Sequence, residues 1–273
     1  MCELLNVSSS GFYDWQSRKP RVSKTKLIET EVVSIFEKSR GTYGSPRVFD
    51  ELKEKGFKVS KTTVARVMKN KGLLARPKRR FVKTTDSAHD YKVFKNLLDR
   101  KFESSRLNEK WVSDISYIPT KKGWTYLTTI LDLADRMIVA WHLSENMGCA
   151  NTTSKTLKLA LKRRKINKPL LFHSDRGVQY ACTEFRDLIG NNKLITQSMS
   201  RKGNCWDNAV AESFFKTLKT EWTNKFVYKD IHEAKSSIFD YIERWYNTQR
   251  KHSAIGYLSP LQKHNLFFNR TAA

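Results

Sequence analysis

The pattern of apolar residues in this chain changes once, near residue 108, and that change limits the folds open to it. Before this point apolar residues recur at helical spacing, and after it they form short runs rich in β-branched and aromatic residues, which are typical of strands. The strand-like runs span 111–118, 124–133, 137–143, 169–172 and 194–196. The first three are separated by turns, and the last two alternate with helical segments. This order predicts an α/β domain with a mixed sheet and flanking helices, preceded by an all-α module.

Residues 1–75 are predicted to form short helices. Apolar residues recur at helical spacing over 26–38, Pro46 can open the next helix, and Ser60 is suited to cap the one after that. Residues 60–83 contain nine basic residues and no acid. Three short helices, the last of them basic, are typical of a helix-turn-helix module that binds DNA. A plain three-helix bundle without a DNA role is the other interpretation.

The chain has a large excess of positive charge. Lysine and arginine number 51 against 27 acids, for a net charge of +24, which indicates a nucleic acid or an anionic membrane surface as the partner. No apolar run approaches the roughly 20 residues that span a bilayer, and the first residues lack the order of a secretory signal. We therefore expect nucleic acid in the cytoplasm and no membrane partner. The cysteines, at 2, 149, 182 and 205, are expected to be free thiols.

Three further segments complete the predicted organisation. Residues 76–106 form a basic linker, which either follows the phosphates of a duplex or is a solvated hinge. Its basic residues are Arg76, Lys78, Arg79 and Arg80. Residues 107–225 form the sheet-containing core. Residues 226–273 form a helical extension, whose main helix begins at Asp230 and Glu233 with the spacing of a capping box.

Three acids lie at positions in the predicted strands and helix that suggest a functional role. Asp114 lies inside a strand-like run, where a buried carboxylate is costly unless it is paired or bound to a metal. Asp175 follows an apolar run, at the strand end where α/β sheets gather their ligands. Glu212 lies on a predicted helix, on one face with Lys216 and Lys219. Glu212 either forms a surface salt bridge with these lysines or is a metal ligand beside lysines that bind phosphate.

The loop before this helix has residues suited to DNA. Arg201 and Lys202 can bind phosphate, and Trp206 can stack on a base or pack in the core. Asp207 or Asn208 is expected to cap the helix. Together, three carboxylates of this kind suit hard divalent cations, and two such ions support phosphodiester chemistry.

At these residues a family becomes recognisable. The strings WVSDISYIP, LFHSDRGVQY and SMSRKGNCWDNAVAESFFKTLKTE resemble the catalytic core of bacterial insertion-sequence transposases, specifically the second-frame (OrfB) protein of the IS-three group. The resemblance extends to both ends of the chain, and the zinc-binding His/Cys module of retroviral integrases is absent from the sequence. It implies a ribonuclease-H-like fold shared with retroviral integrases. It also implies that Asp114, Asp175 and Glu212 form a DDE triad and that Lys219 belongs to the same motif.

The resemblance carries further expectations. It implies two Mg²⁺ or Mn²⁺ ions, cleavage of DNA at element ends, and transfer of the freed 3′-hydroxyl onto another phosphodiester. The implied partners are element-end and target DNA, further copies of the chain, and an upstream-frame (OrfA) protein to which family members are usually fused. Because Met1 enters within a helical motif, we expect that the chain alone lacks part of its end-recognition apparatus. Two rivals remain: a non-catalytic DNA-binding regulator and a cellular nuclease of the same fold.

Overall fold

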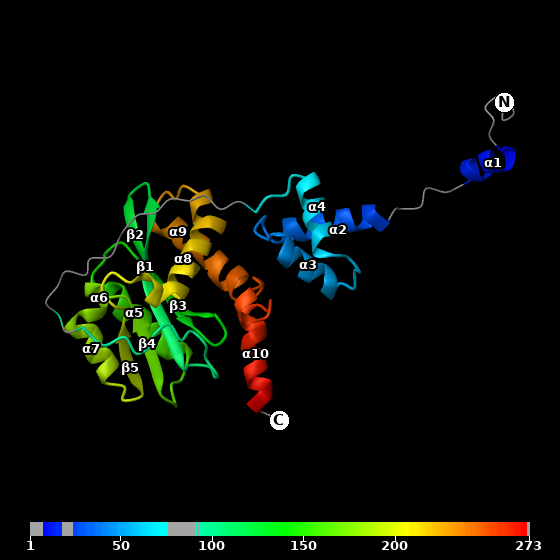
Figure 1. Cartoon of the computed structure of the whole chain (residues 1–273). Coiled ribbons are helices and arrows are strands. Elements are labelled where there is room, and N and C mark those ends of the chain that lie inside the picture. The colour runs from blue at the N-terminus through cyan, green and yellow to red at the C-terminus, as the bar shows by residue number, and fades with distance from the viewer. Residues whose placement is uncertain (1–7, 18–23, 76–90, 92, 272–273) are drawn as a thin grey trace. The chain divides into compact units, whose positions relative to one another are not determined.

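The computed structural model describes residues 8–17, 24–75, 91 and 93–271, and the chain divides into two compact units, Met1–Ala75 and Arg76–Ala273 (Figure 1). The basic residues expected to contact DNA from the linker lie outside the described residues: Arg76, Lys78, Arg79 and Arg80. Among the helices that are described, none combines the length and the apolar character needed to cross a bilayer.

The described part of the N-terminal unit is helical. Its helices are α1 (Ser9–Ser17), α2 (Lys24–Lys38), α3 (Ser45–Glu54) and α4 (Lys61–Asn70). Helices α2, α3 and α4 pack on one another around Val48, Leu52 and Val64, whose side chains are fully buried. Ser60 caps α4, because its Oγ accepts a hydrogen bond from the backbone N–H of Thr63. The three helices predicted from periodicity are therefore confirmed.

A five-stranded mixed sheet forms the centre of the C-terminal unit. Its strands are β1 (Lys110–Thr120), β2 (Gly123–Asp132), β3 (Ile138–Ser144), β4 (Leu170–Ser174) and β5 (Ile195–Met199), in the order β3-β2-β1-β4-β5. The first three strands form an antiparallel meander, and β4 and β5 run parallel to β1. The α/β prediction with a mixed sheet is confirmed. Pairing of β1 with β4 covers only Lys110 to Val112, so the second half of β1 extends beyond β4.

Helices cover both faces of this sheet (Figure 1). On one face α5 (Thr153–Arg163), α6 (Val178–Ala181) and α7 (Thr183–Gly190) share a buried apolar cluster with the strands, which includes Trp111 of β1. Because neighbouring residues of a strand point to opposite faces, Asp114 faces the other side. There β1 is contacted by α8 (Ala209–Glu221) and α9 (Ile231–Phe239).

The C-terminal extension begins as predicted and then departs from a regular helix. Asp230 caps α9 by accepting hydrogen bonds from the backbone N–H groups of His232 and Glu233, and the Glu233 carboxylate accepts one from Lys229 N. A single helix was expected over 230–248, but α9 ends at Phe239 and continues as a π-helix, η4 (Asp240–Tyr246). The predicted apolar stripe is buried on both sides of this change, at Ala234, Ile238, Ile242 and Trp245, so the sequence pattern did not indicate the change in winding. The last helix is α10 (Pro260–Thr271).

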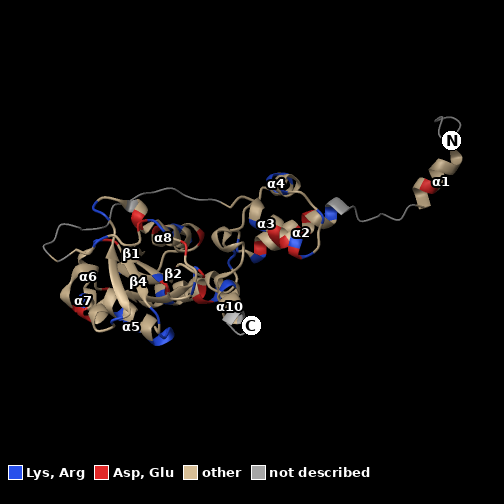
Figure 2. Ribbon diagram, turned by 60° about the horizontal axis from the view of Figure 1, so that its bottom comes forward, with Lys and Arg blue, Asp and Glu red and all other residues tan. Residues whose placement is uncertain are grey.

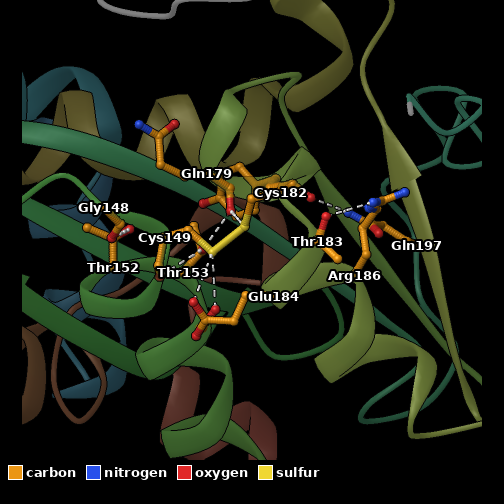
Figure 3. The surroundings of a disulfide bond; sticks show 12 residues. Gly148, Cys149, Thr152, Thr153, Gln179, Cys182, Thr183, Glu184, Arg186 and Gln197 are labelled. Atoms are coloured by element: carbon orange, nitrogen blue, oxygen red, sulfur yellow. Dashed lines mark hydrogen bonds between the residues drawn. A yellow bond between two sulfur atoms is a disulfide. The ribbon is translucent and has the colours of Figure 1, made fainter. Parts of the chain in front are cut away.

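The expectation that all cysteines are free thiols is wrong for two of them. Cys149 and Cys182 form a disulfide bond (Figure 3). It joins the short 3-10 helix η1 (Cys149–Asn151), just before α5, to the residue between α6 and α7. The two cysteines are 33 residues apart in sequence, and only the packing of α5 against α7 brings them together.

Candidate active site

Asp114 lies near the middle of β1, just past the last residue of that strand that pairs with β4. Its backbone partner on β2 is Thr129, and its Oδ1 accepts a hydrogen bond of 2.8 Å from the backbone N–H of Ile115. The side chain is half-buried. Asp114 therefore lies two residues beyond the last pair between β1 and β4.

Asp175 directly follows β4, the neighbouring parallel strand. Its Oδ1 accepts a hydrogen bond of 2.9 Å from the backbone N–H of Gly177. A Cβ on Gly177 would lie 3.1 Å from that same oxygen and 3.1 Å from Oε1 of Gln179. The glycine thus permits the tight approach that orients Asp175, which is a packing reason for the Asp-Arg-Gly sequence.

Glu212 lies in the first turn of α8, on an exposed part of that helix. The opposite face of α8 is the apolar stripe expected from the sequence, formed by the buried residues Ala211, Phe214, Phe215 and Leu218. This stripe packs α8 against β1 and thereby sets the position of Glu212 relative to Asp114.

The electrostatics of the three acids show that they are neighbours. Burial raises the pKa of Asp114 well above its ordinary value, and the negative charges of Asp175 and then Glu212 raise it further. Burial and the charge of Asp175 also raise the pKa of Glu212. Charges act this strongly only over short distances. The tertiary structure therefore brings three carboxylates that are far apart in the sequence within electrostatic reach of one another.

The two lysines of α8 differ in their surroundings. Lys216 is exposed, whereas Lys219 is half-buried and its pKa is lowered by burial, an effect that the charge of Asp114 opposes. In the described part of the chain, no ion pair joins Glu212 to either lysine. Lys219 thus lies close enough to Asp114 to interact with its charge and does not neutralise Glu212 by direct contact.

The composition of this site fits a hard divalent cation. Its ligands would all be carboxylate oxygens, which Mg²⁺ and Mn²⁺ prefer, and a cation would relieve the repulsion that raises their pKa values. Oδ1 of the buried Asn208, close to the strand of Asp114, has no hydrogen-bond partner within the described residues. Nowhere in that part of the chain do three His, Cys, Asp or Glu side chains already stand close enough to hold a metal ion. Binding through all three acids would therefore require them to move closer together.

The loop before α8 is held by an ion pair that the sequence did not indicate. Asp207 is fully buried, and its carboxylate accepts hydrogen bonds from Nε and Nη2 of Arg201, at 2.9 and 2.7 Å, and from Nε of Arg100, at 3.0 Å. These cations hold the pKa of Asp207 well below its ordinary value. Arg201 is paired with the buried Asp207, and about half of its side chain stays exposed and accessible to DNA.

The neighbouring residues of this loop answer two questions left open by the sequence. Trp206 is 69% exposed, which excludes core packing, and Lys202 is exposed as well. Of the two residues expected to cap α8, Asn208 occupies the N-cap position, but its side chain makes no capping hydrogen bond. Its Nδ2 donates instead to the backbone carbonyl of Ser113. The local sequence could not reveal that Asp207 pairs with Arg100 or that Asn208 bonds to Ser113.

Comparison with known proteins agrees with this architecture. Two models described as "Integrase core domain" match residues 104–205 and 193–260, and one described as "HTH-like domain" matches residues 23–81. A solved structure, the simian T-cell lymphotropic virus intasome in complex with a PP2A regulatory subunit, aligns with a TM-score of 0.50 at 12% identity and covers 85% of this chain and 74% of that chain. This likeness shows a shared fold.

Curated relatives are similar over nearly the whole chain. Transposase InsF for insertion sequence IS3A of Escherichia coli K12 is 38% identical, over 97% of this chain and 93% of its own length. A 31 kDa protein of insertion element IS600 from Shigella sonnei is 39% identical, over 95% of this chain and 96% of its own length. The chain therefore belongs to the IS3 family of insertion-sequence transposases, with an integrase core domain preceded by an HTH-like domain.

Proposed function

We propose that this transposase cleaves DNA at the ends of its insertion sequence in a metal-dependent reaction and joins the freed 3′-hydroxyl to another phosphodiester. Asp114, Asp175 and Glu212 would hold two Mg²⁺ or Mn²⁺ ions. When bound, such ions activate the attacking oxygen and stabilise the leaving oxygen. Water and then the DNA hydroxyl act as nucleophiles, so no covalent bond between protein and DNA is needed.

One observation carries this proposal. Three acids, on β1, directly after the parallel β4 and in the first turn of α8, lie within electrostatic reach of one another: burial raises the pKa of Asp114, and the charges of Asp175 and Glu212 raise it further. Mutual repulsion of this kind is unfavourable for folding and is relieved when a cation binds. It is therefore a feature of a binding site rather than of a stabilising network. A half-buried cation, Lys219, beside Asp114 can contact a phosphate held there.

The other basic surfaces fit a DNA partner. Helix α4 carries Lys61, Arg66 and Lys69 as exposed residues and contains no acid (Figure 2). We propose that residues 1–75 bind duplex DNA through this helix, that 76–106 follow the phosphates, and that 107–273 form the catalytic core with its extension. Because two element ends must be cut and joined, we also propose that several copies assemble on DNA, together with the upstream-frame protein.

The experiment uses a duplex oligonucleotide that carries the element end. Cleavage and joining are measured with Mg²⁺ and with Mn²⁺ for the wild type and for Asp114→Asn, Asp175→Asn and Glu212→Gln. Each substitution replaces a carboxylate by an amide, which is a far poorer ligand for these ions. Asp187→Asn and Glu184→Gln are matched controls, because both residues are exposed on α7, outside the acid cluster.

We expect each of the three variants to lose cleavage and joining while binding the duplex as tightly as the wild type. The two controls should keep wild-type rates. Comparable cleavage by any of the three would remove that residue from the site. Binding without metal-dependent cleavage by the wild type would instead favour a DNA-binding regulator, and cleavage without joining would favour a nuclease.

A further inference from the structure

A short series of buried hydrogen bonds connects β1, which carries Asp114, to the start of α8, which carries Glu212, and to α6, which begins shortly after Asp175. Nδ2 of Asn208, at the start of α8, donates to the backbone carbonyl of Ser113 on β1 at 3.1 Å. Oγ of the same Ser113 shares a hydrogen bond of 2.8 Å with the hydroxyl of Tyr180 on α6. We call these three residues the Ser113 network. All are buried, with exposed fractions of 1% for Ser113, 1% for Tyr180 and 3% for Asn208.

Each member lies close in sequence to one of the acids. Ser113 directly precedes Asp114. Asn208 precedes Glu212 by one helical turn, and Tyr180 belongs to the helix that begins just after Asp175 and Gly177. The Ser113 network therefore joins β1 to α8 and to α6 within five residues of each acid.

The bond from Asn208 replaces a missing strand partner. Pairing between β1 and β4 ends at Val112, so Ser113 is the first residue of β1 after it that has no partner on β4. A buried carbonyl needs a donor, and the Asn208 amide supplies it. The N-terminal end of α8, and with it Glu212, is thereby attached to the strand of Asp114 at the residue next to that acid.

Tyr180 fixes the third element. Its backbone carbonyl accepts a hydrogen bond of 2.7 Å from Nε2 of Gln197, and its ring packs against Phe172 and Phe185 in the core. Burial raises the pKa of its hydroxyl well above the ordinary value, and the charges of Asp114 and then Asp175 raise it further. The hydroxyl therefore remains protonated and able to take part in its hydrogen bond with Ser113.

We propose that Asn208 and Tyr180 are positioning residues that, acting through Ser113, limit how far the three acids move apart, so that only a small movement brings them together around a divalent cation. This inference rests on the proposed function. The acids repel one another, and the Ser113 network opposes that repulsion by attaching α8 and α6 to the same residue of β1. Neither residue touches the reacting atoms in this account. Their loss weakens metal binding because the carboxylates are then less well arranged before the ion arrives.

The test compares two variants of the network with one matched control. Asn208→Ala removes the bond to β1, and Tyr180→Phe removes only a hydroxyl while keeping the ring in the core. The control is Asn247→Ala. Asn247 is also a buried asparagine bonded to a strand backbone, at Ile138 of β3, away from the acids. Its loss is expected to lower thermal stability without changing the acid site.

Binding of MnCl₂ to the full chain is measured by titration calorimetry, beside the thermal midpoint and the cleavage of an end duplex over a range of metal concentrations. Loss of partners that orient metal ligands weakens binding or activity by about 10- to 100-fold. We expect a weakening of that size in Asn208→Ala and Tyr180→Phe, with the half-maximal metal concentration for cleavage raised accordingly. Asn247→Ala should bind Mn²⁺ as the wild type does.

The outcomes distinguish a failure of the positioning role from a failure of the proposed function. Wild-type Mn²⁺ affinity in either network variant would remove that residue from the proposal, and equal weakening in Asn247→Ala would show that the effect is one of general stability. If Asn208→Ala does not fold, Tyr180→Phe still decides, since it leaves the core packing intact. The proposed function itself fails on a different result, namely no difference in Mn²⁺ binding between the wild type and Asp114→Asn.

Discussion

The guanidinium of Arg250 donates two hydrogen bonds to the carboxylate of Glu221, at 2.8 and 2.6 Å, and both side chains are almost completely buried. The hydroxyl of Tyr241 donates a third, at 2.8 Å. Glu221 ends α8, the helix of Glu212, whereas Arg250 and Tyr241 belong to the C-terminal extension. The extension is thus attached to the helix that carries the third acid.

This buried ion pair should dominate the stability of the C-terminal extension. Arg250→Ala leaves the Glu221 carboxylate buried without its partner, which should lower the free energy of unfolding by about 3–5 kcal/mol. Arg244→Ala is the control, because its pair with Asp240 is exposed and should contribute only about 0–1 kcal/mol. Urea unfolding followed by tryptophan fluorescence measures both. Similar losses of unfolding free energy in the two variants would contradict the expectation that the buried pair contributes more than the exposed one.

His142 should make the protein less stable in mild acid. Burial, and then the charges of Lys155 and Lys235, lower its pKa from 6.5 to about 4. Between these values the unfolded chain binds a proton that the folded chain does not, so stability falls as the pH drops through that window and is fully present above it. His142→Gln should lose less stability than the wild type between pH 7 and pH 4.5 in urea unfolding. His232→Gln, at an exposed position, should follow the wild type.

Lys219 and Lys216 should differ in their contribution to catalysis. If Lys219 contacts a phosphate at the acids, Lys219→Ala removes a charge-assisted hydrogen bond and should slow cleavage and joining roughly 10-fold or more. Its affinity for metal should stay the same or rise, because removing a cation favours a dication. Lys216 is exposed, so Lys216→Ala should change the rates of cleavage and joining only slightly. Near wild-type joining by Lys219→Ala would exclude the phosphate contact.

The basic linker should appear in the salt dependence of DNA binding. On duplex DNA, log affinity falls with log salt by roughly 0.9 for each phosphate contact. Neutralising the linker residues together should flatten that slope in a filter-binding titration: Arg76, Lys78, Arg79 and Arg80. The control removes an equal number of exposed lysines on or next to α5: Lys158, Lys162, Lys165 and Lys168. An unchanged slope in the linker variant would mean that these residues do not contact DNA.

Local chemistry was enough to predict much of this protein from its sequence. The side-chain period separates the helical unit from the sheet, and the caps at Ser60 and Asp230 follow from groups two or three residues away. The mid-strand position of Asp114 and the strand-end position of Asp175 were visible because an acid is unusual in such surroundings. Their DDE assignment came from the resemblance to a family and stays a prediction.

What only the tertiary structure decided are the partners of buried polar groups. Asp207 looked like a helix cap, yet it binds Arg100, 107 residues away, and Asn208 bonds Ser113 across 95 residues. The disulfide of Cys149 and the ion pair of Arg250 arise in the same way. Sequence periodicity reports which face of an element is buried. It does not report which distant polar group shares that burial, because that depends on how the helices pack on the sheet.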